Sequence, residues 1–117
     1  MSFSDDDGNT WMPARKTKLP NNNSSVDVCN AGEKVILAFN DSSSVRTPLS
    51  LGLSHDGGMN FREIRHLETD HGEFSYPSIL CLPDGKLLIS YTHQKDTIQI
   101  KVVLSDWITR RPDRIQE

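Results

Sequence analysis

Two aspartates, Asp6 and Asp56, recur in one short pattern and are the carboxylates whose setting could carry chemistry. They lie in "SDDDGNTW" and "SHDGGMNF". A repeated carboxylate could serve acid–base catalysis or bind calcium. The pattern also suits a tight turn, in which aspartate accepts backbone N–H groups, glycine takes a positive φ and the aromatic packs inward. We predict two structural turns of this kind, formed by Ser4, Asp6, Gly8 and Trp11, and by Ser54, Asp56, Gly58 and Phe61.

The other reactive side chains show no arrangement typical of a catalytic or metal centre. The histidines and cysteines lack metal-ligand spacing, and there is no Gly-x-Ser-x-Gly turn or phosphate-binding loop. We therefore predict no metal and no cofactor. For Cys29 and Cys81 we expect two buried free thiols, with a single disulfide as the alternative. The four histidines are expected at the surface: His55, His66, His71 and His93.

Composition limits the size of the fold and the partners. With 117 residues, 35% of them apolar, the chain can form one small domain. The 13 basic and 16 acidic residues are spread along the sequence, which argues against nucleic acid or an anionic membrane as a partner. No apolar run approaches the length of a bilayer span.

The elements that must position any site are β-strands in a repeat of about fifty residues. "CNAGEKVILAFN" aligns with "CLPDGKLLISYT", cysteine on cysteine and Phe39 on Tyr91. This period matches a four-stranded propeller blade rather than a helical repeat. "PLSLGLS" and "TIQIKVVL" alternate apolar and polar residues, as half-buried strands do. "NAGEK" and "PDGK" are typical hairpin turns.

These patterns predict an all-β chain of antiparallel four-stranded blade units. Strands are expected near 34–40, 48–54, 61–67, 76–82, 86–92 and 97–104, with no long helix. We assign 1–107 to this partial propeller. "NNNSS" and the charged tail 108–117 are expected to be irregular.

The two turns, with the strands that follow them, resemble the Asp-boxes of the bacterial neuraminidase repeat (BNR) family of sialidases and their relatives. The likeness extends through "TKLPNNNSSVD", "FNDSSSVRTPLSLGLSHDGGMNF" and "GEFSYPSILCLPDGKLLISYT". It implies a six-bladed β-propeller, of which this chain would supply about two C-terminal blades. It also implies that the boxes are structural and lie away from the substrate.

The same resemblance implies a site that holds an acidic sugar. Arg46, eight residues before Ser54, would match an arginine that grips the sugar carboxylate, for which the planar guanidinium is suited. Tyr76 would match the nucleophile, since sialidases use tyrosine where most glycosidases use a carboxylate. The alternatives are a solvated Arg46 and a packed strand tyrosine. Asn23 and Asp27 would match polar positions beside the pocket, or would belong to a solvated turn.

Departures from the family pattern leave three hypotheses. Pro77 follows Tyr76 where typical sialidases have serine, and Thr92 stands where they have glutamate. The acid/base aspartate, the glutamate that deprotonates the tyrosine and two further arginines would lie on earlier blades. The first hypothesis is that the chain would be the C-terminal part of a sialidase-like exo-glycosidase, inactive alone. The second is a non-catalytic carbohydrate-binding or scaffold module. The third hypothesis is self-association into a ring, since two blades leave unpaired strand edges.

Overall fold

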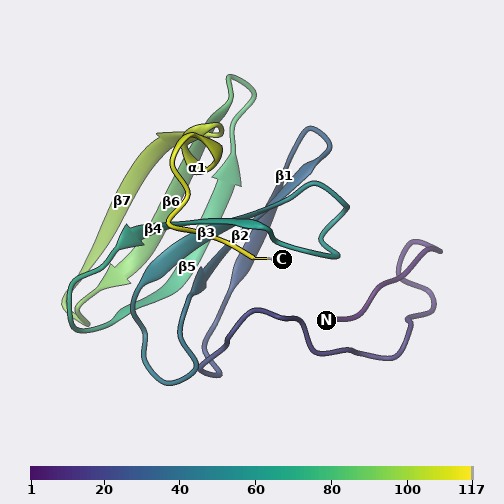
Figure 1. The fold of residues 1–117 in the computed structure, drawn as a ribbon, viewed down its shortest axis with the longest axis horizontal. Helices are drawn as coiled ribbons and strands as arrows, with labels where there is room; N and C mark the ends of the chain where they lie inside the picture. The colour runs from purple at the N-terminus through teal and green to yellow at the C-terminus, as the bar shows by residue number, and fades with distance from the viewer. Residues whose placement is uncertain (117) are drawn as a thin grey trace.

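A computed structural model describes residues 1–116 and contains two antiparallel β-sheets packed face to face (Figure 1). The first sheet has the strand order β1-β2-β3-β4-β8, and the second has the order β5-β6-β7. The strands of the first sheet are β1 (Asp27–Ala31), β2 (Lys34–Asn40), β3 (Leu49–Ser54), β4 (Glu63–Glu68) and β8 (Arg114–Ile115). Those of the second are β5 (Phe74–Cys81), β6 (Lys86–His93) and β7 (Thr97–Leu104).

The predicted all-β class and its six strands are confirmed, each within about two residues of the expected bounds. β1 precedes the "NAGEK" hairpin, in which Gly32 has φ 65°, and "PDGK" forms the corresponding turn with Gly85 at φ 83°. The one helix of the described residues is α1 (Trp107–Arg110). Two sheets do not close a ring, so the six-bladed propeller stays a prediction.

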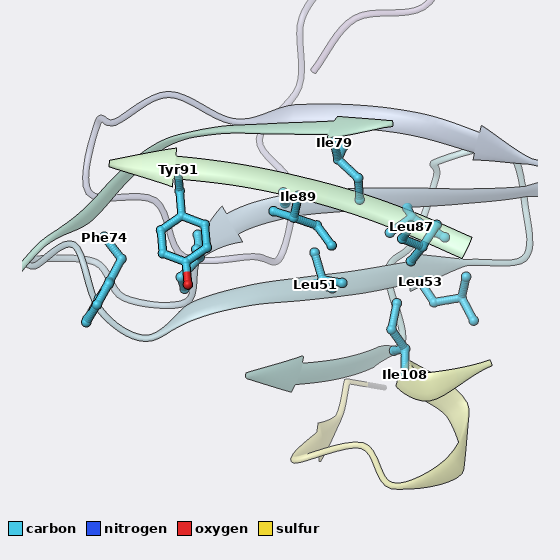
Figure 2. Packing of buried hydrophobic residues seen from close by; sticks show 11 residues of the cluster. Leu51, Leu53, Phe74, Ile79, Leu87, Ile89, Tyr91 and Ile108 are labelled. Carbon is cyan, nitrogen blue, oxygen red and sulfur yellow. The ribbon is translucent and has the colours of Figure 1, made fainter. Parts of the chain in front are cut away.

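The core lies between the two sheets. Each sheet contributes alternate side chains of its strands, as the period of two requires. Figure 2 shows Leu51 and Leu53 of β3 facing Leu87 and Ile89 of β6, with Ile108 of α1 at the margin. The buried cluster comprises Ile36, Ala38, Leu49, Leu51, Leu53, Phe74, Ile79, Leu87, Ile89, Tyr91 and Ile108.

The C-terminal segment differs from the expected irregular tail. α1 packs on β3 and β4, where the Arg65 guanidinium stacks 3.9 Å over the Trp107 ring and donates to the Trp107 carbonyl. β8 then pairs with β4, Arg114 opposite Ile64. The sequence did not predict β8, because charged and apolar residues alternate there over too few positions to indicate a strand. Pairing with β4 supplies the order that local propensity does not.

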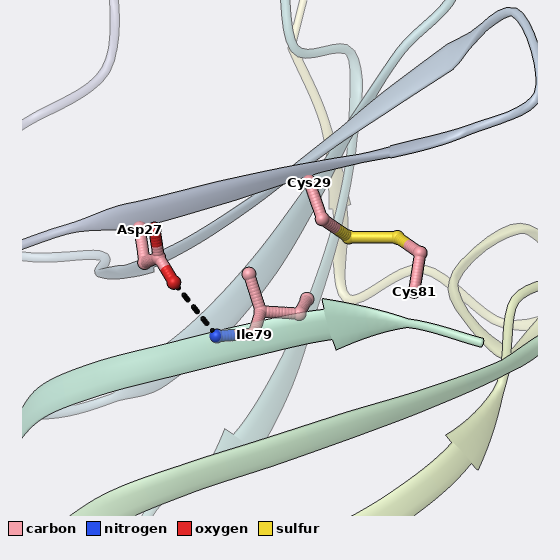
Figure 3. The surroundings of a disulfide bond; sticks show 4 residues. All are labelled: Asp27, Cys29, Ile79 and Cys81. Carbon is pink, nitrogen blue, oxygen red and sulfur yellow. Dashed lines mark hydrogen bonds between the residues drawn. A yellow bond between two sulfur atoms is a disulfide. The ribbon is translucent and has the colours of Figure 1, made fainter.

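Cys29 and Cys81 form a disulfide between β1 and β5, which corrects our expectation of two free thiols (Figure 3). The two sequences align cysteine on cysteine, yet the two hairpins pair differently. Cys29 lies opposite Ile36, whereas Cys81 lies opposite Leu87, the counterpart of Val35 at the 52-residue separation. A shift of one residue in register turns a side chain to the other face of its sheet. The two sulfurs therefore face each other across the sheets instead of pointing the same way.

Residues 1–26 contain no strand and run beside β1, outside both sheets (Figure 1). Between this segment and the first sheet lies a groove of about 880 Å³. Its wall on the sheet side includes Val28, Val35 and Leu37, and its wall on the N-terminal side includes Phe3 and Leu19. The first sheet thus has one face in the core and one face toward a partly open groove.

Candidate functional site

The two Asp-box turns have the same internal hydrogen bonds. In the second box, the Ser54 hydroxyl donates to Asp56 Oδ1 (2.7 Å) and accepts from the Gly58 N–H (2.9 Å). Asn60 donates to Asp56 through its backbone N–H and its side-chain amide, both at 2.9 Å. Gly58 has φ 92°, the left-handed region that favours glycine. These bonds use both carboxylate oxygens of Asp56, as a self-contained turn requires.

The first box repeats this pattern with threonine in place of asparagine. Ser4 donates to Asp6 Oδ1 (2.8 Å), Gly8 N donates to the Ser4 hydroxyl (2.9 Å), and Thr10 donates to both oxygens of Asp6. Hydrogen bonds lower the pKa of Asp6 and that of Asp56 to about 2, with the side chain of Thr10 and of Asn60, respectively, as the largest cause.

The aromatic residues of the two boxes lie in different surroundings. Phe61 is 6% exposed and packs beside Gly52, as predicted. Trp11 is 63% exposed, and its indole N–H reaches only the Gly8 carbonyl (3.1 Å). The expectation that Trp11 packs inward is wrong, because no strand follows the first box to give the ring a surface to cover.

At the opposite end of β3 from the Asp56 turn, Arg46 and Tyr76 come together. The Arg46 guanidinium carbon lies 5.4 Å from the centroid of the Tyr76 ring. Arg46 belongs to the loop between β2 and β3, and Tyr76 to β5 of the other sheet. The Phe74 N–H donates to the Arg46 carbonyl (2.9 Å), which fixes the loop against the start of β5. The expected proximity of Arg46 and Tyr76 is therefore present, and it brings both sheets to one site.

A bulge in β5 presents Tyr76 to solvent. The ladder with β6 shifts between Ser75 and Ser78, so Tyr76 and Pro77 are out of register, and Tyr76 has φ 53°. A positive φ is uncommon for a bulky residue, and bulges often redirect a side chain beside a functional site. The Tyr76 side chain is 61% exposed. Pro77, which departs from the family pattern, supports this unpaired position because it has no N–H to donate.

Asp41 and Asn40 hold the Arg46 loop at its start. Arg114 of β8 donates to both oxygens of Asp41, at 2.8 and 2.6 Å, and the Asp41 side chain is only 7% exposed. This bond raises the pKa of Arg114. The buried Asn40 amide donates to the Phe74 carbonyl (2.9 Å) and accepts from the Ser24 hydroxyl (3.1 Å). The contacts of Asp41 and those of Asn40 join segments distant in sequence, so sequence reasoning missed them.

A small cavity of about 250 Å³ adjoins Arg46. It is lined by Asn22, Ser44, Val45, Arg46, Gly72 and Glu73. Asn22 donates to the Val45 carbonyl, which ties the N-terminal segment to the Arg46 loop. Glu73 is a carboxylate that sequence reasoning missed, although it lies three residues before Tyr76. Its carboxylate pairs with Lys95 (3.2 Å).

The other two residues suggested for substrate binding lie in structural contacts. Asn23, with φ 65°, forms a turn in which its N–H donates to the Asn21 side chain (2.8 Å). It does not line the cavity beside Arg46, whereas its neighbour Asn22 does. Asp27 accepts from the Ile79 N–H (2.9 Å) and so bridges β1 to β5 beside the disulfide (Figure 3). The structure therefore brings together Arg46 and Tyr76, whereas Asn23 takes part in a turn and Asp27 in a contact between strands.

A buried polar group between the sheets is distinct from this site. The Tyr91 hydroxyl donates to Glu68, and Lys101 lies 3.6 Å from the same carboxylate. Burial, followed by the hydrogen bond to Glu68, raises the pKa of Tyr91. Tyr91 is 1% exposed and cannot meet a substrate.

Residues 1–116 contain neither a cluster of metal-ligating side chains nor a helix that could span a membrane. Across that range, no group of three or more His, Cys, Asp or Glu side chains could hold a metal ion. In the same part of the chain, no helix is long and apolar enough to cross a membrane.

Comparison with known families agrees with the two repeats. The model of the BNR repeat-like domain matches residues 1–89, most of the chain. The matched range contains both Asp-boxes, Arg46, Tyr76 and the disulfide. A comparison with curated proteins found no match. On the extent of the family match and the two box turns, the chain belongs to the BNR repeat-like domain family.

Proposed function

We propose that the chain forms the carboxylate-binding part of a sialidase-like exo-glycosidase and binds a terminal acidic sugar of the sialic-acid type. The observation that carries this proposal is the position of Arg46 over Tyr76, at the end of β3 opposite the Asp56 turn. An arginine and an exposed tyrosine from two sheets, held together by buried contacts, form a defined surface rather than two independent side chains.

Arg46 supplies the anion recognition in this proposal. Its guanidinium stays charged at any relevant pH and can donate two parallel hydrogen bonds to a carboxylate. The bond between Asp41 and Arg114, and that between Phe74 and the Arg46 carbonyl, limit the movement of the loop. Limited movement lowers the entropy cost of binding.

Tyr76 is proposed as the nucleophile of the complete enzyme. Tyr76 is largely exposed and its ring faces Arg46, so a sugar held by its carboxylate at Arg46 would lie beside the phenol. A phenol suits this substrate because a carboxylate nucleophile would be repelled by the sugar's own carboxylate. The nucleophile needs a base and the leaving group needs an acid. Glu73 is engaged with Lys95, and the family places the acid and the base on earlier blades.

A second candidate function is a non-catalytic carbohydrate-binding module. Arg46 stacked on the Tyr76 ring is itself a surface on which a sugar acid can rest, and it needs no base. Thr92 in place of the family glutamate favours this alternative. The two functions share the same ligand and differ in the role of the Tyr76 hydroxyl.

Binding is tested with N-acetylneuraminic acid and its methyl ester, by NMR titration of the labelled chain. We expect the acid to shift resonances of Arg46, Tyr76 and their neighbours, and the neutral ester to bind at least about tenfold more weakly, or ~1.4 kcal/mol, because it cannot form the charged bidentate contact. Arg46→Lys keeps the charge but loses the planar fork, so it should weaken binding of the acid. Arg62→Lys, an exposed arginine next to Phe61 at the other end of β3, is the matched control and should bind as the wild type does.

Equal binding of acid and ester, or equal sensitivity to Arg46→Lys and Arg62→Lys, would contradict the proposed site. A fluorogenic sialoside tests the catalytic role. The chain by itself should show no measurable turnover, since the acid and the base are on other blades in the family. Robust turnover that persists in Tyr76→Phe would remove Tyr76 from the nucleophile role.

A further inference from the structure

The second sheet has an apolar outer face that none of residues 1–116 covers. We call it the open face; it consists of Leu80 of β5 and of Ile98, Ile100 and Val102 of β7. The four side chains are between 55% and 69% exposed. Because β7 is the last strand of its sheet, the open face also borders an unpaired strand edge. A contiguous apolar surface of this kind on a small domain usually marks an interaction site.

The first sheet contains residues at the same repeat positions as the open face, and there these residues are covered. Leu49, Leu51 and Leu53 lie opposite Asn40, Ala38 and Ile36 in the β2–β3 ladder. At the 52-residue separation of the repeats, those three partners correspond to Thr92, Ser90 and Leu88. These lie opposite Ile98, Ile100 and Val102 in the β6–β7 ladder.

The three residues of β7 are therefore the counterparts of three leucines that are at most 1% exposed. The leucines are buried by the inward face of the second sheet, which contains Ile79, Leu87 and Ile89. By pairing and separation, the counterparts of these covering residues are Val28, Val35 and Leu37. We call these three the groove face, since they line the 880 Å³ groove beside residues 1–26.

The chain thus carries, at its two ends, the two halves of an interface that it already makes internally. The open face corresponds to the half contributed by the first sheet, and the groove face to the half contributed by the second. We propose that the open face of one copy packs into the groove face of a second copy, head to tail, in the geometry that joins the two sheets within the chain. Such an interface is heterologous, and repetition closes a ring or extends a chain of copies.

The disulfide predicts the register between copies. Within the chain, Cys29 and Cys81 face each other with Cα atoms 6.0 Å apart. Leu80 pairs with Leu88 as Cys29 pairs with Ile36, so Leu80 is the counterpart of Cys29 on the open face. Asn30 pairs with Val35 as Cys81 pairs with Leu87, so Asn30 is the counterpart of Cys81 in the groove. Leu80 of one copy should therefore face Asn30 of the next.

A cross-linking experiment tests that register. Leu80→Cys and Asn30→Cys are prepared separately, each with the native disulfide intact, because both positions are exposed and tolerate the change. We expect the mixture to form a disulfide-linked heterodimer under mild oxidation, since the two Cβ atoms lie within bonding range only in the proposed geometry. Gln99→Cys, exposed on β7 but on its other face, replaces Leu80→Cys as the matched control and should not cross-link to Asn30→Cys.

Association in solution gives an independent measurement by sedimentation from micromolar to near-millimolar concentration. The wild type should form species larger than a dimer as concentration rises. Ile100→Arg should be monomeric, because it places a charge in the buried contact, and Gln99→Arg should associate as the wild type does. Val28→Arg blocks the groove face and should also be monomeric. An equal mixture of Ile100→Arg and Val28→Arg should form a dimer and nothing larger, since one functional half remains on each copy.

Three results would overturn the proposal. The first is a wild type that stays monomeric at the highest concentration. The second is Leu80→Cys cross-linking to itself as readily as to Asn30→Cys, which would indicate two open faces packed together. The third is association that is equally sensitive to Ile100→Arg and Gln99→Arg. The proposal concerns the chain by itself, because in a complete sialidase-like enzyme the earlier blades would cover the groove face. None of these results depends on sugar binding, so this proposal and the proposed function fail independently.

Discussion

The two Asp-boxes have the same hydrogen bonds, but only the second is part of a sheet. In each, the serine hydroxyl bridges the aspartate and a glycine N–H, and the aspartate accepts from the residue four positions on. Phe61 of the second box is buried on the first sheet, while Trp11 of the first box is exposed. The comparison shows that the turn forms from its own residues, whereas burial of the aromatic ring requires a sheet. The contribution of a box to stability should therefore depend on where the box is attached.

The largest expected difference is between the aromatic residues. Phe61→Ala should lower the free energy of unfolding by about 3 kcal/mol, because it removes a buried ring and leaves a cavity beside Gly52. Trp11→Ala should change it by less than about 0.5 kcal/mol, since the ring is already in water. Urea denaturation of both variants measures the pair. Similar losses for the two would show that Trp11 is buried in solution and that the boxes do not differ.

A smaller difference is expected between the serines. Ser54 is fully buried, so Ser54→Ala leaves the Gly58 N–H without its acceptor and should cost about 1–2 kcal/mol. In Ser4→Ala the freed Gly8 N–H is exposed and can bond to water, so the urea midpoint should hardly move. Ser54→Thr keeps the hydroxyl and serves as the control. If Ser4→Ala proved as damaging as Ser54→Ala, the first box would have to be docked against the sheets.

The smallest expected effect is in the acid range. The ordinary pKa of an aspartate is 3.8, and that of Asp56 in the folded chain is about 2. A lowered pKa stabilises the folded state above about pH 4, and this stabilisation is lost as the pH falls toward 2. Asp56→Asn should therefore flatten the acid side of a stability–pH curve. Asp6→Asn should leave it unchanged, because the first box lies in the strandless segment and can open without unfolding the sheets.

Thermal melts of both variants between pH 2 and 6 measure this difference. The range runs from the folded-state pKa of about 2 to above the ordinary aspartate pKa of 3.8. Equal flattening by Asp56→Asn and Asp6→Asn would mean that the first box unfolds together with the sheets. No change in Asp56→Asn would mean that the Asp56 carboxylate does not have a lowered pKa in solution.

Local sequence was sufficient to predict the six strands from β2 to β7 and the box turns. Alternating runs such as that of β7 specify which residues share a face, and Gly85 and Gly58 occupy turns that need a positive φ. The family resemblance, rather than the local pattern, suggested Arg46 and Tyr76 as neighbours, and the two side chains do lie together. The sequence did not identify Glu73 or Asn22 beside Arg46, nor the bond between Asp41 and Arg114. These contacts join segments that are distant in the chain and that no repeat or periodic pattern relates.

The cysteines show most clearly where sequence ends and tertiary structure begins. The alignment of Cys29 with Cys81 established that the two residues occupy equivalent positions in two repeats, and equivalent positions are expected to point the same way. Only the pairing of each hairpin, which differs by one residue, turned one sulfur toward the other. The exposure of Trp11 was likewise decided by the absence of a strand beneath it. In both cases the sequence by itself determined the local unit, and the three-dimensional arrangement decided which surface that unit meets, because a side chain's surroundings depend on neighbours distant in the chain.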